Sequence, residues 1–118
     1  MTTPDALVEQ YYGLKPAEFG FLEFLELRQS VQPEEWTGFT LKLRLRSSTI
    51  HGAKCLNLIF SGVHDLRIGS LEGLLKYFLE IRSIRERQME GLNYRVVESQ
   101  HSAFTFACRS FVATVDAD

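Results

Sequence analysis

The segment GFTLKLRLRS, residues 38–47, alternates apolar and polar side chains without interruption. Its apolar side chains come from Phe39, Leu41, Leu43 and Leu45, and its polar ones come from Thr40, Lys42, Arg44 and Arg46. A period of two predicts a β-strand that turns one face to the core and the other to solvent. The three cations, which we call the basic row, either bind a partner or keep the exposed face soluble.

Carboxylates in the preceding segment favour the second role for the basic row. Glu23 and Glu26 lie in GFLEFLELRQS, residues 20–30, which is also strand-like. If the two strands form a hairpin, these acids lie beside the basic row, where a pair of opposite charges contributes about 0.2–1 kcal/mol. A phosphate-binding face and a contact with another protein are the alternatives.

Two apolar segments change phase partway along. In residues 20–30 the phase changes near residue 24, which predicts either a β-bulge or burial on both faces. In AFTFACRSFVATV, residues 103–115, it changes near Arg109 or Ser110, which predicts one long strand with a register break or a kinked pair of strands.

The other apolar segments are short and closely spaced. Strands are predicted over residues 20–30, 39–46, 55–62, 63–70, 76–86 and 92–99, and in the last segment, 103–115. Residues 70–80 fit either a helical or a strand period, and we expect a loop or turn through 70–75 before the strand at 76–86. At the N-terminus, Pro4, Asp5 and Gly13 are typical helix start and stop residues.

The predicted fold is mainly β. We expect one domain over residues 1–118, with a helical lid at 1–16 and antiparallel strands across 19–116. Seven to eight strands would form an antiparallel sandwich or a strongly curved sheet.

Composition excludes several classes of protein. The chain has 118 residues, 45% of them hydrophobic, which suits one globular core. Its net charge of −2 disfavours a nucleic-acid partner on electrostatic grounds. The N-terminus lacks the pattern of a signal peptide, and no apolar run could span a membrane, so we expect a cytoplasmic protein without a membrane partner.

No pattern of catalytic or cofactor-binding residues occurs. Cys55 and Cys108 each lie in an apolar run, which favours small buried side chains over a disulfide or a reactive thiol. His51, His64 and His101 lack the spacing of a metal site, and no nucleotide-binding glycine motif is present. We therefore predict no catalytic residues, no metal and no cofactor, with an enzyme as the less favoured alternative.

Two polar segments contain the candidate partner-binding residues. The mixed-charge segment EIRSIRERQME contains Arg82, Arg85 and Arg87, and arginine is enriched at protein interfaces. The connection VQPEEWTG contains the second set, Glu34, Glu35 and Trp36, which could form a binding rim.

The C-terminal half resembles a known family. LNLIFSGVHDLRIGSLEG at 56–73, YFLEIRSI at 77–84 and GLNYRVVESQHSAFTFACRSFVATV at 91–115 are similar to small β-rich immunity proteins encoded beside bacterial polymorphic toxins. The first strand of that family opens with a Phe-His-Asp-Ala-like signature, whereas AEFGFLEFLELR, residues 17–28, contains neither His nor Asp. No functional residue is therefore carried over. The resemblance implies a non-enzymatic bacterial protein that works by binding another protein.

Two functions are therefore predicted. The first is a protein-binding module, with an immunity-like protein as its specific form, that contacts a partner or a second copy of itself through a strand edge or a loop end. The second is a small-molecule-binding protein or enzyme with a pocket between curved sheets.

Overall fold

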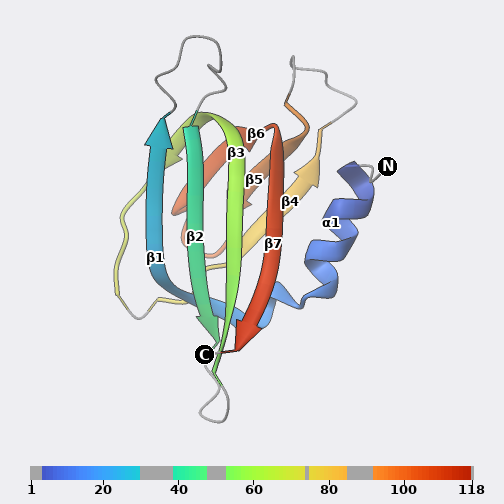
Figure 1. Ribbon diagram of the computed structural model, residues 1–118. Helices are drawn as coiled ribbons and strands as arrows, with labels where there is room; N and C mark the ends of the chain where they lie inside the picture. Colours follow the sequence, from blue (N-terminus) through green and yellow to red (C-terminus); the bar gives the residue numbers. More distant parts are fainter. Residues whose placement is uncertain (1–3, 30–38, 48–52, 74, 85–91, 118) are drawn as a thin grey trace.

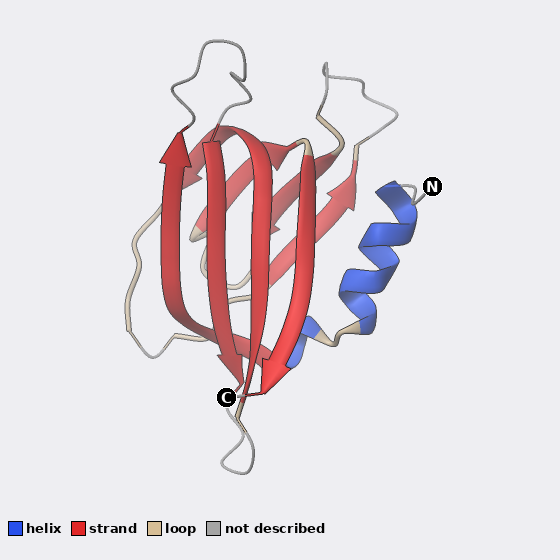
Figure 2. Ribbon diagram, in the orientation of Figure 1, coloured by secondary structure: helices blue, strands red, loops and turns tan. Residues whose placement is uncertain are grey.

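The computed structural model describes residues 4–29, 39–47, 53–73, 75–84 and 92–117. Figure 2 shows that strands dominate these residues. The elements are α1 (Pro4–Gly13), η1 (Pro16–Glu18), β1 (Phe19–Gln29), β2 (Phe39–Ser47), β3 (Lys54–Ile68), β4 (Leu79–Ser83), β5 (Tyr94–Glu98), β6 (Phe104–Cys108) and β7 (Ser110–Ala117). The prediction of a mainly β fold with one N-terminal helix is confirmed.

The strands form one strongly bent antiparallel sheet with two facing parts. Its strand order is β1-β2-β3-β6-β5-β4, and β7 pairs with β3. In Figure 1 strands β1, β2, β3 and β7 form the front layer, while β4, β5 and β6 lie behind it. The front layer is called the front sheet below.

Strand β3 joins the two layers because it bends. Its first part pairs with β2 and β7, and its last part pairs with β6. Gly62 and Asp65 have positive φ values of 63° and 56°, and glycine reaches that region without a steric penalty. The prediction of two separate strands over 55–62 and 63–70 is therefore wrong, since the backbone bends without ending the strand.

Two predicted irregularities are present in the strands, and one predicted strand begins later than expected. The register of β1 shifts between Leu22 and Phe24, which confirms the bulge. Strand β6 ends at Cys108 and β7 begins at Ser110, which confirms the break near Arg109. The predicted strand over 76–86 begins too early, because β4 starts only at Leu79.

The core fills the space between the two layers. On β2 the leucines of the opening segment are buried, and the side chains between them face outward, as the alternation predicts. Phe60 of β3 contacts Phe106 of β6 across the core, with ring centroids 4.9 Å apart in an edge-to-face arrangement. The buried cluster comprises Tyr11, Phe19, Leu41, Leu43, Leu45, Leu56, Leu58, Phe60, Val63, Tyr77, Leu79, Ile81, Tyr94, Val96, Ala103, Phe104, Phe106, Cys108 and Phe111.

Helix α1 covers the free edge of β4. The Tyr11 hydroxyl donates to the backbone oxygen of Leu79 at 2.6 Å, and the Tyr12 hydroxyl donates to that of Ile81 at 3.4 Å. The Tyr12 hydroxyl also accepts a hydrogen bond from the Ile81 N–H at 3.1 Å. Two tyrosines thus satisfy backbone groups that an edge strand would otherwise expose. No helix among the described residues is long and apolar enough to cross a membrane.

Replacing Tyr12 with Phe should loosen this edge without unfolding the protein. The change removes the acceptor for the Ile81 N–H, at an expected cost of about 1 kcal/mol. Hydrogen exchange of the Ile81 amide should accelerate several-fold, while exchange at Val96 in the neighbouring strand stays unchanged. Equal acceleration at both amides would indicate global destabilisation instead.

Glu98 is a buried carboxylate at the end of β5. Its two oxygens accept four backbone hydrogen bonds, from Phe78 (2.9 Å), Gln100 (2.8 Å), His101 (2.7 Å) and Ala103 (3.1 Å). Burial acts to raise the pKa of Glu98, but the four N–H donors outweigh it, and the pKa lies below its ordinary value. This side chain therefore ties the turn after β5 to the segment before β4.

Candidate protein-binding surface

One face of the front sheet is uncovered in the described part of the chain. In Figure 1, β4–β6 lie behind the front sheet and α1 lies beside it, so neither covers the side that faces the viewer. We call this side the outer face. On each strand, its side chains alternate with those that point into the core. They belong to Glu23, Phe24, Glu26, Lys42, Arg44, Arg46, Asn57, Ile59, Val112, Thr114 and Asp116.

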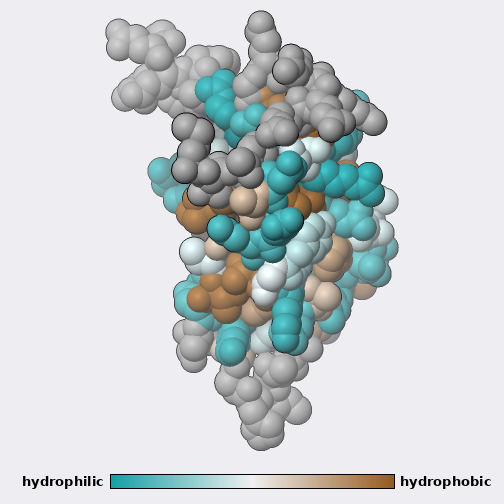
Figure 3. Space-filling model, turned by 90° about the vertical axis from the view of Figure 1, so that its right-hand side faces the viewer, coloured by the Kyte–Doolittle hydropathy of each residue, from teal (hydrophilic) through white to brown (hydrophobic). Residues whose placement is uncertain are grey.

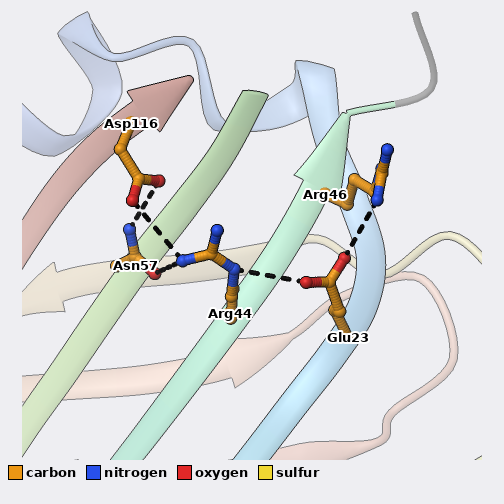
Figure 4. A network of polar contacts seen from close by, with 5 residues as sticks. All are labelled: Glu23, Arg44, Arg46, Asn57 and Asp116. Carbon is orange, nitrogen blue, oxygen red and sulfur yellow. Dashed lines mark hydrogen bonds and ion pairs between the residues drawn. The ribbon is translucent and has the colours of Figure 1, made fainter. Parts of the chain in front are cut away.

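A polar network crosses the outer face, with Arg44 at its centre (Figure 4). The Arg44 guanidinium lies 3.3 Å from a Glu23 oxygen and 3.5 Å from an Asp116 oxygen, and it donates to Asn57 at 3.0 Å. Arg46 lies 3.5 Å from the second Glu23 oxygen, and Asn57 donates to Asp116 at 2.9 Å. The predicted pairing of Glu23 with the basic row is confirmed, and the network links all four strands.

The charges around Arg44 keep it ionised. Desolvation acts to lower the pKa of Arg44, but the nearby carboxylates of Asp116 and Glu23 outweigh it and raise the pKa above its ordinary value. Since several neighbours hold the guanidinium, its orientation is largely set before any partner arrives. A cation held in place loses little conformational entropy when it binds.

Three large apolar side chains flank this network. Phe24, Ile59 and Val112 are 47%, 38% and 57% exposed. Ile59 and Val112 are register partners on adjacent strands, and Phe24 pairs in register with Arg44. Aromatic residues and arginine are the side chains most enriched in protein interfaces. The outer face therefore combines apolar anchors with a pre-arranged polar network.

Of the six predicted partner-binding residues, the structure describes only Arg82. It lies on β4 in the rear layer, its side chain is 78% exposed, and its guanidinium lies 3.8 Å from Glu80. The other five, Glu34, Glu35, Trp36, Arg85 and Arg87, lie outside the described residues. The role of all six residues stays a prediction.

The apolar part of the outer face was not predicted from the sequence. Ile59 follows an inward residue of β3, so its outward phase was readable from the alternation. Phe24 was not assigned, because the bulge in β1 changes the phase at that position. An apolar residue at an outward position of the alternation is the sequence pattern that indicates such a binding surface.

Reactive side chains in the described residues are poorly placed for chemistry. Cys55 and Cys108 are buried and form no disulfide, and burial raises the pKa of Cys108 to about 12, which disfavours the thiolate. His64 and His101 are exposed; His64 lies on β3 and His101 in the turn between β5 and β6, while His51 lies outside the described residues. No group of three or more His, Cys, Asp or Glu side chains within the described residues could hold a metal ion.

Comparison with known proteins identifies the family. No curated protein and no solved structure matches the chain. The family model described as immunity protein PIM8, however, matches residues 3–114, nearly the whole chain. The resemblance to immunity proteins is therefore confirmed, and it extends beyond the C-terminal half into α1 and β1. The chain belongs to the immunity protein PIM8 family.

Proposed function

We propose that this chain is a bacterial, cytoplasmic immunity protein that neutralises a toxin by binding it through the outer face, without catalysing a reaction. Family membership supports a protein-binding role. The observation that carries the choice of surface is the uncovered sheet face, on which Phe24, Ile59 and Val112 surround a network centred on Arg44.

The energetics of this face suit a tight complex. Complete burial of a large apolar side chain contributes about 1.5–3 kcal/mol, and these three start about half exposed. The polar groups of the Arg44 network orient the partner and select it, because burying any of them without a hydrogen-bond partner costs desolvation free energy. Apolar contacts would thus supply affinity, and the Arg44 network would select the partner.

The alternative, a small molecule held between curved sheets, has less support. Side chains with at most 4% exposure fill the space between the two layers where the core cluster lies. A second alternative is contact through the residues predicted from the sequence: Glu34, Glu35, Trp36, Arg82, Arg85 and Arg87. Of these, Arg82 lies on β4, and its variants can be tested beside variants of the outer face.

We expect a toxin gene beside the gene of this chain, and the test is protection from that toxin. Co-expression of that toxin with the wild-type chain should restore bacterial growth, and the two proteins should co-purify at a fixed ratio. A chain of unrelated sequence expressed at the same level serves as the control. Failure to bind the toxin, with the chain folded and abundant, would contradict the proposal.

A further inference from the structure

The three outermost strands of the bent sheet differ in how their free edges are protected. The free edge of β4 is capped by Tyr11 and Tyr12, as described above. Strand β1 has two register shifts, and near its start Gly20 and Phe21 pair with the segment before β4, where the Tyr77 N–H donates to the Gly20 oxygen at 2.8 Å. Bulges, charges and covering segments are the usual ways in which proteins protect an edge.

Strand β7 is the least protected of the three within the described residues, with one charged side chain, Asp116, near its end. It pairs with β3 alone, in a regular register from Lys54↔Ala117 to Ser61↔Ser110 without a shift. Residues 110–115 are uncharged and include two exposed valines, Val112 and Val115. A regular, uncharged edge is suited to pair with another strand.

The alternation of the ladder identifies the backbone groups at this edge. The Ser61 oxygen accepts a hydrogen bond from the Arg109 N–H at 3.0 Å, so Ser61 directs its backbone groups toward β7. Since Ser61 pairs with Ser110, the residues in phase with Ser110 face β3, and the intervening ones face away. The groups expected at the free edge therefore belong to Phe111, Ala113 and Val115.

A groove beside this edge has room for an extended chain. It lies between α1 and β7, has a volume of about 420 Å³, and is lined by Leu7, Gln10, Tyr11, Gly13, Leu14, Phe111 and Ala113. Figure 3 shows this side of the molecule, where apolar surface alternates with polar surface. The opposite side of β7 bears Val112 and Thr114 of the outer face, so the groove and the outer face adjoin along one strand.

We propose that β7 accepts an extended strand of the bound toxin, which continues the front sheet and places every second, apolar side chain in the groove beside α1. This inference rests on the proposed function and specifies how the partner binds. Unpaired backbone N–H and C=O groups in a row recognise another extended backbone, and the lining side chains favour apolar residues facing them.

Amide hydrogen exchange of the chain, alone and with the toxin from the adjacent gene, tests the backbone contact. In the free chain the amides of Phe111, Ala113 and Val115 should exchange fast and those of Val112 and Thr114 slowly. In the complex the fast set should slow at least tenfold. A complex that forms without this slowing overturns the strand proposal but leaves the proposed function intact, whereas absence of a complex removes both.

A proline variant provides the second readout. Val115→Pro removes the N–H expected at the free edge and should weaken toxin binding at least tenfold, while Val115→Ala shortens the side chain, keeps the N–H and should bind nearly as wild type. Equal binding by both variants would overturn the proposal. A free chain that is dimeric, with the same amides already protected, would also overturn it and would make a second copy the occupant.

Discussion

Replacing Glu98 with Gln should lower the free energy of unfolding by about 3 kcal/mol, one of the largest effects expected of any single change outside the apolar core. The two carboxylate oxygens accept four backbone N–H groups. A glutamine has one acceptor oxygen, so its NH₂ group would face two of these donors. Urea unfolding of Glu98→Gln beside Glu72→Gln, an exposed control, measures the difference.

The same carboxylate should make the free energy of unfolding depend on pH in the acid range. The pKa of Glu98 is lower in the folded protein than its ordinary value of 4.5, so folding favours the ionised form. This contribution is fully present above pH 4.5 and is lost as the pH falls below that value through the folded pKa. Glu98→Gln should flatten the stability profile in that range, and a variant that keeps the full acid dependence of the wild type would contradict this role.

Truncation of the apolar anchors should weaken toxin binding about 100-fold, which corresponds to roughly 2.7 kcal/mol. The double variant Phe24→Ala with Val112→Ala removes two exposed side chains from the outer face. Because neither belongs to the buried core cluster, the melting temperature should change by only a few degrees. Titration calorimetry with the toxin gives the affinity, and thermal unfolding of the free variant checks the fold.

The matched control lies on the rear layer. Arg82→Glu reverses an exposed charge on β4, far from the outer face in the sheet order, and should leave the affinity within about twofold of wild type. If Arg82→Glu abolishes binding and the double alanine variant does not, the rear layer and not the outer face is the contact surface.

Local patterns predicted much of the fold. The unbroken alternation over residues 38–47 gave the position of β2 and the inward direction of its leucines, because burial on one face has a period of two. The phase changes near residue 24 and near Arg109 gave the bulge and the break between β6 and β7 for the same reason. These features depend on neighbours along the chain.

Features that depend on distant segments were not predictable in this way. Ser61 and Gly62 read as the end of a strand, yet pairing with β6 and β7 carries β3 through the bend. The capping of β4 by two tyrosines of α1 joins residues nearly 70 positions apart. Whether Phe24 and Val112 lie under another layer is also a tertiary property, so the sequence marked them as apolar without marking them as exposed.

The most direct measurement of the central claim is an NMR titration of the ¹⁵N-labelled chain with the toxin from the adjacent gene. Amide shifts should concentrate on outer-face residues of the front sheet, including Phe24, Arg44, Ile59 and Val112, and along the β7 edge. Shifts confined to β4, β5 and β6, with the front sheet unchanged at saturation, would contradict it.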